Sequence, residues 1–208
     1  TADDAGLMPS ILLIGEDAAC CALGRRLVAD VPGWTLRAEP INTRGVTELR
    51  KGIPRYLGVA AKLHVLCIAD ADRACGPSAR ASLLPRDPPP GFLLRLAVPS
   101  AESWIVADRE RFARHFGVKV ASLPRSPDAA VDVKRQLLAA LKGSTRRDVR
   151  NGMVSWDARA PGVDYNAMLC EFVGRGWDPL AAEAASPSLG RAVARLRELA
   201  ALPPPTGP

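Results

Sequence analysis

The sequence predicts an α/β fold, in which helices wind both faces of a mainly parallel sheet and an α-helical C-terminal extension follows. Short apolar runs bounded by turn-forming residues occupy 11–15, 65–69 and 93–98, and such runs are typical of strands buried on both faces of a parallel sheet. Helical patterns alternate with these runs, which requires crossover connections and hence parallel strands. Beyond Gly117 only helical patterns recur.

Apolar spacing and chain breakers predict the elements that follow the first strand. Residues 18–29 carry apolar side chains at helical spacing, and a proline-glycine pair ends that helix. Residues 34–38 predict an edge strand. A helix is expected over 46–61, interrupted near Gly52 and Pro54, because proline lacks the backbone donor of a helix interior.

The next elements alternate in the same way. The strand 65–69 is followed by a loop and by a short helix from Ser78. A proline-rich loop at 87–91 leads into a strand over 92–98. A single helix over 101–116 is then predicted by its apolar spacing.

Amphipathic patterns continue in the second half. They predict helices at 131–141, 165–174 and 189–202, and the hydroxyl of Ser186 is expected to cap the last of these. We divide the chain into an α/β domain at 8–116 and a helical extension at 117–208 that packs on the same core. The residues before Met8 are expected to lie outside the fold.

Composition limits the class of protein. The 208 residues contain 28 Lys and Arg against 22 Asp and Glu, a net charge of +6 that favours a polyanionic partner. The five cysteines form no CxxC pair, so we expect neither a disulfide framework nor a zinc site. No apolar run of about 18 residues and no signal peptide is recognised, so a cytoplasmic protein without a membrane span is expected.

Acidic residues follow each of the three apolar runs. Glu16 and Asp17 follow the first, Asp70 and Asp72 the second, and Glu102 the third. Ligands of open α/β sheets bind at the carboxyl ends of the strands, so these acids are expected to meet at one edge. Clustered carboxylates repel one another, and an oxygen-preferring cation such as Mg²⁺ offsets that repulsion.

Each of these residues also has a simpler structural interpretation. On an extended strand Asp70 and Asp72 would point the same way, about 6 to 7 Å apart, although an Asp after a strand often only caps a turn. Glu102 falls in the first turn of a helix, where the helix dipole stabilises an acid. His64 and His115 have no neighbouring nucleophile, and no glycine-rich phosphate loop is present.

An ordered set of motifs resembles a bacterial Toprim-like family of uncharacterised proteins over nearly the whole chain from Ser10. The motifs are Gly-Glu-Asp at 15–17, Ile-Ala-Asp-Ala-Asp at 68–72, Arg-Leu-Ala-Val at 95–98, Glu-Ser-Trp-Ile-Val-Ala-Asp at 102–108, Asp-Val-Lys at 132–134 and Ser-Pro-Ser-Leu at 186–189. The resemblance implies a Toprim-like, doubly wound sheet that binds Mg²⁺. Such domains act in topoisomerases, primases and overcoming-lysogenisation-defect-type nucleases.

Carried over by position, the resemblance implies catalytic and metal-binding roles for Glu16, Asp70 and Asp72, with Glu102 as an additional metal ligand. The usual first motif has glutamate before glycine, whereas here the glycine comes first. Asp17 is therefore an alternative to Glu16 as the acid that faces the metal.

The expected function is a Mg²⁺- or Mn²⁺-dependent phosphodiesterase, a nuclease, acting on nucleic acid in phage defence or mobile-element biology. Lys134, Arg73 and Lys51 are expected to contact the nucleic acid, and a protein partner encoded nearby is compatible with this setting. Whether the substrate is DNA or RNA, and whether cleavage is internal or terminal, stays open.

Two alternatives stay open as well. The first strand also resembles that of a receiver domain, in which Asp70 would accept a phosphoryl group while Glu16 and Asp17 hold Mg²⁺. Such a module carries a Thr or Ser and then a Lys-Pro downstream, whereas the strand at 93–98 is followed by Pro99 and Ser100 without that lysine. The other alternative is a non-catalytic Toprim-like subunit of a larger complex.

Overall fold

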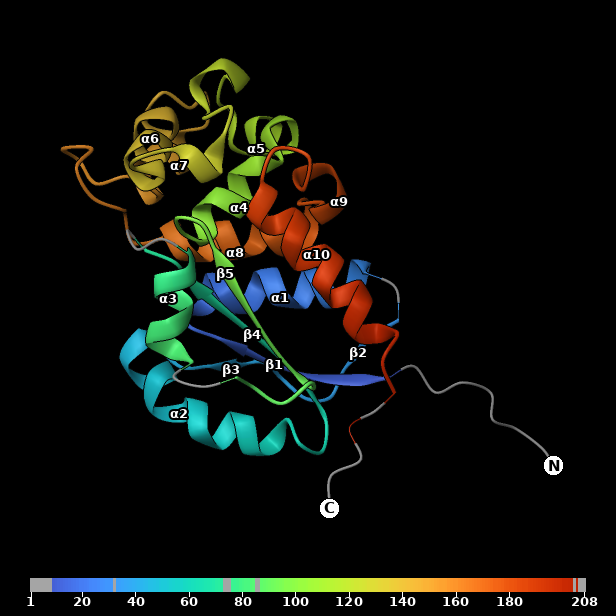
Figure 1. Ribbon diagram of the computed structural model, residues 1–208. Coiled ribbons are helices and arrows are strands. Elements are labelled where there is room, and N and C mark those ends of the chain that lie inside the picture. The colour runs from blue at the N-terminus through green and yellow to red at the C-terminus, as the bar shows by residue number, and fades with distance from the viewer. Residues whose placement is uncertain (1–8, 32, 73–75, 85–86, 204, 206–208) are drawn as a thin grey trace.

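A computed structural model describes residues 9–31, 33–72, 76–84, 87–203 and 205. Its sheet contains five parallel strands in the order β2-β1-β4-β5, with β3 pairing the carboxyl half of β1 (Figure 1). The strands are β1 (Ser10–Gly15), β2 (Thr35–Leu36), β3 (Ile41–Asn42), β4 (His64–Asp70) and β5 (Phe92–Ala97). The α/β fold with a mostly parallel sheet is thus confirmed.

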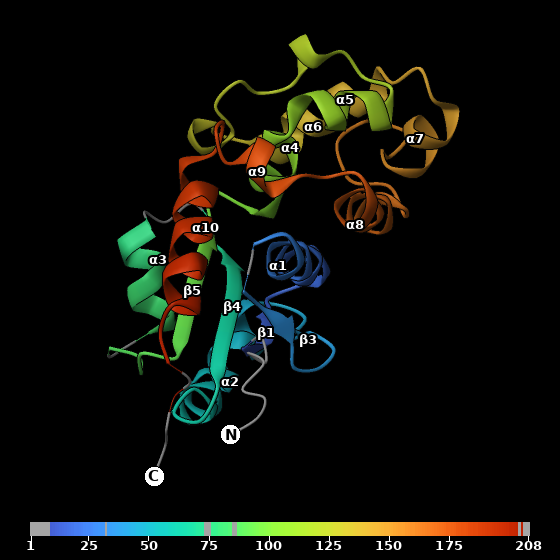
Figure 2. The same ribbon diagram turned by 90° about the vertical axis from the view of Figure 1, so that its right-hand side faces the viewer.

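The helices surround this sheet and form a layer beyond its carboxyl edge (Figures 1 and 2). They are α1 (Ala18–Asp30), α2 (Val46–Val59), α3 (Gly76–Leu83), α4 (Ala101–Ala107), α5 (Arg109–Phe116), α6 (Val133–Lys142), α7 (Arg147–Gly152), α8 (Tyr165–Arg175), α9 (Pro179–Ala182) and α10 (Pro187–Ala200), with 3-10 turns η1 (Val120–Ser122) and η2 (Pro127–Ala129). None of the helices in the described ranges is both long and apolar enough to span a bilayer.

Both faces of the sheet are buried, because alternate side chains of each strand enter two separate cores. Leu13 and Ile68 pack with α1, α4, α8 and α10 in the larger core. Ile14 and Cys67 point to the other face, where they pack with α2 and α3. This explains why the strand sequences are continuously apolar rather than alternating.

The strand register brings the acidic segments together. Gly15 pairs with Ile68 across β1 and β4, and Asp70 pairs with Ala97 across β4 and β5. All these strands run in the same direction, so their carboxyl ends reach the same edge of the sheet. The residues that follow Gly15, Asp70 and Ala97 therefore start from neighbouring positions.

Buried tryptophans connect the second half of the chain to the first. The indole N–H of Trp34 donates to the carbonyl of Leu196 at 3.0 Å, and that of Trp177 donates to the carbonyl of Trp104 at 3.1 Å. The indole N–H of Trp104 donates to the hydroxyl of Ser188 at 2.7 Å. The larger core accordingly contains residues from 8–116 and from 117–208.

Two predicted helices differ from the structure. The single helix expected over 101–116 is divided into α4 and α5 at Asp108, whose buried carboxylate accepts the N–H of Asp178 at 3.0 Å. Conversely, α2 continues through Pro54. Burial of Leu49, Ile53 and Leu57 on one face offsets the roughly 3 kcal/mol cost of an interior proline.

The remaining boundaries agree more closely. The edge strand expected at 34–38 is shorter in the structure, where it forms β2, and β3 was not predicted. The hydroxyl of Ser186 caps α10 by accepting the N–H of Leu189 at 3.3 Å, as predicted. Short α7 and α9 were missed because they contain too few turns for an apolar period to appear.

Candidate functional site

Asp70 is held by contacts from two other elements. It is the last residue of β4, and its Oδ1 accepts the N–H of Ala101 at 2.8 Å, at the start of α4. The thiol of Cys20 approaches the same oxygen at 3.9 Å. A strand end, a helix start and α1 thus fix this carboxylate at the carboxyl edge of the sheet.

The two acids after β1 have different local roles. Glu16 Oε2 accepts the N–H of Asp70 at 3.1 Å, so this side chain joins the ends of β1 and β4. Asp17 caps α1, because its Oδ1 accepts the N–H of Cys20 at 2.8 Å. Only Asp17 of the two lines the cavity described below.

Asp72 reaches the site by a different route from the predicted one. We expected an extended Asp-x-Asp segment, but β4 ends at Asp70 and Asp72 has a φ of 52°, in the left-handed region. Strand alternation therefore does not explain its direction, and that premise was wrong. The turn nevertheless places Asp72 on the wall of the same cavity as Asp70.

Glu102 combines several contacts at the start of α4. The hydroxyl of Ser100 donates to its Oε2 at 2.7 Å, and the phenol of Tyr165 donates to its Oε1 at 3.5 Å. Lys134 Nζ lies 3.3 Å from Oε1 and 5.7 Å from the centre of the Tyr165 ring. The ion pair joins α6 to α4 and places the positively charged side chain of Lys134 beside the acids.

Asp17, Asp70, Asp72 and Glu102 line a single cavity of about 370 Å³ together with Lys134. Its wall contains Asp17, Ala19, Asp70, Asp72, Pro99, Ser100, Glu102, Val131, Asp132, Val133, Lys134, Asn166 and Leu169. The sheet edge supplies the first acids, and α4, α6 and α8 complete the wall. The helical extension therefore contributes directly to the site.

Burial and mutual repulsion disfavour ionisation of these acids. Burial, followed by repulsion from Glu102, raises the pKa of Asp70 to about 8, although the N–H of Ala101 opposes the change. Burial also raises the pKa of Glu16, with repulsion from Asp72 adding to the effect. Without a bound cation, Asp70 therefore stays largely protonated at neutral pH.

The carboxylate oxygens in this cavity are the type of ligand that a hard divalent cation prefers. Within the described ranges, no three His, Cys, Asp or Glu side chains are arranged to hold a metal ion. Mg²⁺, however, usually binds one or two protein carboxylates and keeps waters or substrate phosphates as its other ligands. Asp70 and Asp72 meet that smaller requirement, since both line the cavity.

The three residues that were predicted to contact nucleic acid have different outcomes. Lys134 lies in the cavity, as its pairing with Glu102 shows. Lys51 does not line the cavity; it is exposed on α2 and pairs with Glu48 at 2.6 Å. Arg73 lies outside the described residues. Neither Tyr165 nor Asn166 was predicted to contribute, because nothing in their local sequence indicates which loop α8 approaches.

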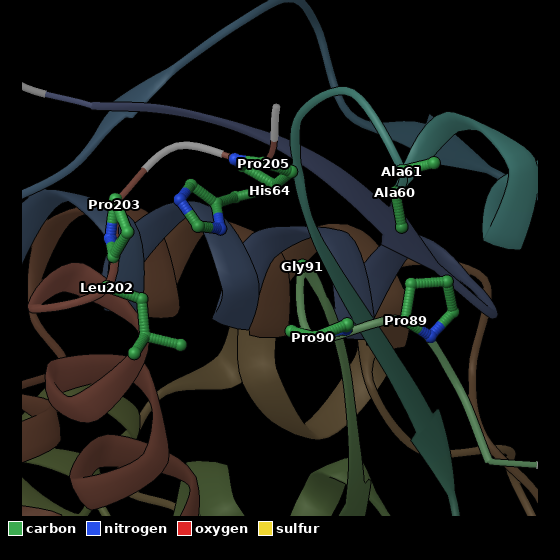
Figure 3. A pocket seen from close by; sticks show the side chains of 9 residues that line it. All are labelled: Ala60, Ala61, His64, Pro89, Pro90, Gly91, Leu202, Pro203 and Pro205. Carbon is green, nitrogen blue, oxygen red and sulfur yellow. The ribbon is translucent and has the colours of Figure 1, made fainter. Parts of the chain in front are cut away.

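A second cavity lies at the opposite edge of the sheet, where β4 begins (Figure 3). His64 is 2% exposed there and packs edge-on against Trp34, with ring centres 5.0 Å apart. Neither imidazole nitrogen has a hydrogen-bond partner among the described residues. Pro203 and Pro205 lie beside the ring in Figure 3. Because this cavity opens at the amino ends of the strands, it takes no part in the acidic site.

Comparisons with known proteins found no relative of this chain. No family model, curated protein or solved structure matches the chain.

Proposed function

We propose that this chain is a Toprim-like phosphodiesterase that uses Mg²⁺ or Mn²⁺ to cleave nucleic acid. One observation carries the proposal: Asp17, Asp70, Asp72 and Glu102, from three loops at one sheet edge, line a single cavity with Lys134. Such a cavity suits a cation and a phosphate together. The excess of Lys and Arg over Asp and Glu in the whole chain favours a polyanionic substrate.

The acids divide the work according to their contacts. Asp70 and Asp72 would hold the cation, and Asp17 would supply a further carboxylate in the same cavity. Glu16 positions Asp70 through the hydrogen bond to its backbone N–H. When bound, the cation supplies positive charge opposite the scissile phosphate and the leaving oxygen.

Lys134 and Glu102 form an ion pair in the wall of the cavity. Lys134 is half-exposed, so its ammonium reaches a phosphate in the cavity without leaving its ion pair. Glu102 orients that ammonium, and the hydroxyl of Ser100 orients Glu102 in turn. Lys134 and a bound cation would together stabilise the negative charge that develops on a phosphodiester during cleavage.

Cleavage of end-labelled oligonucleotides tests the proposal. Single- and double-stranded DNA and RNA are incubated with the chain in Mn²⁺, in Mg²⁺ and in a chelator. Asp70→Asn and Asp72→Asn should each lower cleavage at least 100-fold, by analogy with the removal of one transition-state interaction of about 3 kcal/mol. Glu110→Gln removes an exposed acid from α5 and should leave cleavage unchanged.

Metal-dependent cleavage that persists in Asp70→Asn would show that a contaminant or another site is responsible. Absence of cleavage in every metal, together with absence of Mn²⁺ binding, would favour the non-catalytic Toprim-like subunit. The cytoplasmic setting in phage defence or mobile-element biology, and a partner encoded nearby, belong to the same proposal.

A further inference from the structure

A third cavity, of about 310 Å³, lies along β5 and is distinct from the acidic one. It is bounded by α3 on one side and by α10 on the other, and both helices flank β5 in Figure 2. Its wall is formed by Pro77, Arg80, Leu94, Arg95, Leu96, Val98, Ser188 and Arg191. The consecutive elements α3 and β5 and the distant helix α10 thus each contribute an arginine to one cavity.

Positive charge predominates around these arginines, and the attraction of Glu198 offsets only part of the repulsion that acts on Arg95. Among the described residues no acidic side chain lines the cavity, and none of Arg80, Arg95 and Arg191 forms an ion pair there. Arg195 adds a further positive charge nearby, and the adjacent acid, Glu198, pairs with it at 2.5 Å. Like charges held together without full compensation disfavour the folded chain, and a bound anion removes that cost.

Arg95 is the fixed member of the group. It is partly buried on β5, and its Nε has no hydrogen-bond partner among the described residues. Burial lowers its pKa to about 10, and repulsion from Arg195, Arg191 and Arg80 adds to the decrease. A buried guanidinium donor without an acceptor is costly, so this nitrogen needs an acceptor from outside the described chain.

The chemistry of the lining specifies the anion. A guanidinium presents a planar fork of donors that matches phosphate oxygens in a bidentate manner. Three such groups provide more donors than a carboxylate can accept, whereas a phosphate offers several oxygens to separate forks. The side chains of Arg80 and Arg191 are exposed, so they can move towards a ligand that is bound to the partly buried Arg95.

We propose that the arginine pocket formed by Arg80, Arg95 and Arg191 binds a phosphate group of the nucleic-acid strand on which the acidic cavity acts. This inference rests on the proposed function. Its geometric basis is that Val98 lines the arginine pocket while the next residue, Pro99, lines the acidic cavity. The two cavities therefore adjoin at consecutive residues, so one nucleic-acid strand can reach both of them along the carboxyl end of β5.

Binding is measured separately from cleavage, by fluorescence anisotropy of labelled oligonucleotides in Ca²⁺. The variants are Arg95→Met, which keeps the buried stem, and Arg191→Gln, which changes an exposed side chain and leaves the core intact. Each should weaken binding about tenfold. The slope of log affinity against log salt should fall by about 0.7 on a single strand for each phosphate that a variant no longer neutralises.

Matched controls isolate the pocket from general charge effects. Arg50→Gln removes one exposed positive charge from α2, which contributes no residue to the arginine pocket, and should leave affinity and salt slope unchanged. Oligonucleotides with a 5′-phosphate, a 3′-phosphate or neither distinguish the source of the phosphate. Weakening confined to one phosphorylated end identifies a terminal monoester, whereas equal weakening for all three identifies an internal diester.

A second readout separates failure of this inference from failure of the proposed function. Inorganic phosphate should raise the Tm of the wild-type chain and of Asp70→Asn, but not of Arg95→Met or Arg191→Gln. If both arginine variants bind oligonucleotide and phosphate like Arg50→Gln, the pocket proposal is wrong, even if Mn²⁺-dependent cleavage is found. If the arginine variants alone lose binding but no cleavage occurs, the pocket stands and the nuclease proposal fails.

Discussion

Binding of Mn²⁺ should be linked to the release of a proton from Asp70. Without a cation, burial and the neighbouring acids hold the pKa of this side chain near 8. A carboxylate must lose its proton before it can ligate a metal, so protons compete with Mn²⁺ for the site. The affinity for Mn²⁺ should therefore rise as the pH rises.

The magnitude follows from the ionised fraction of Asp70. With a pKa of about 8, roughly 1% of the side chain is ionised at pH 6 and about half at pH 8. The apparent affinity for Mn²⁺ should accordingly increase about 50-fold between these values. An acid with an ordinary pKa near 3.8 would give almost no change over the same range.

Isothermal titration calorimetry measures both quantities. Titrations at pH 6, 7 and 8 give the affinity, and buffers with different ionisation enthalpies give the number of protons released, which should approach one at pH 6. Asp70→Asn should abolish the linked proton release, while Glu110→Gln should keep it. An affinity that is independent of pH, or proton release that survives in Asp70→Asn, would refute the assignment of the metal to this carboxylate.

Three further outcomes are expected. In a chelator, the free energy of unfolding should decrease as the pH rises from about 4 towards 8, because the folded chain retains a proton on Asp70 that the unfolded chain releases; denaturant melts of Asp70→Asn should lack this decrease. Gly24→Ala should destabilise the fold by about 1 to 3 kcal/mol in urea titrations, since the added Cβ would lie 2.4 Å from Leu13 Cδ1; an unchanged midpoint would mean that α1 shifts freely over β1. Acetyl phosphate should not modify the chain, and a phosphoryl mass increase absent from Asp70→Asn would favour the receiver-like alternative.

The sequence alone was sufficient for the three main strands of the sheet and for the edge at which the acids lie. Continuous apolar runs predict strands buried on both faces, and the structure has β1, β4 and β5 at those places. Parallel strands end at the same edge, so the acids after β1 and β4 had to be neighbours. That inference needed only local pattern and the direction of the chain, and it located Asp70 correctly.

The tertiary structure decided which groups complete the site. Only the packing of α6 and α8 brings Lys134 and Tyr165 to Glu102, because helix periodicity does not specify which loop a helix face meets. The sequence also did not show that β4 ends at Asp70 and that a turn at Asp72 follows in place of the expected extended strand. The arginine pocket likewise joins α10 to α3 and β5, which lie about 90 residues or more before it in the sequence. Contacts of this kind arise from burial of the whole core, which local sequence does not encode.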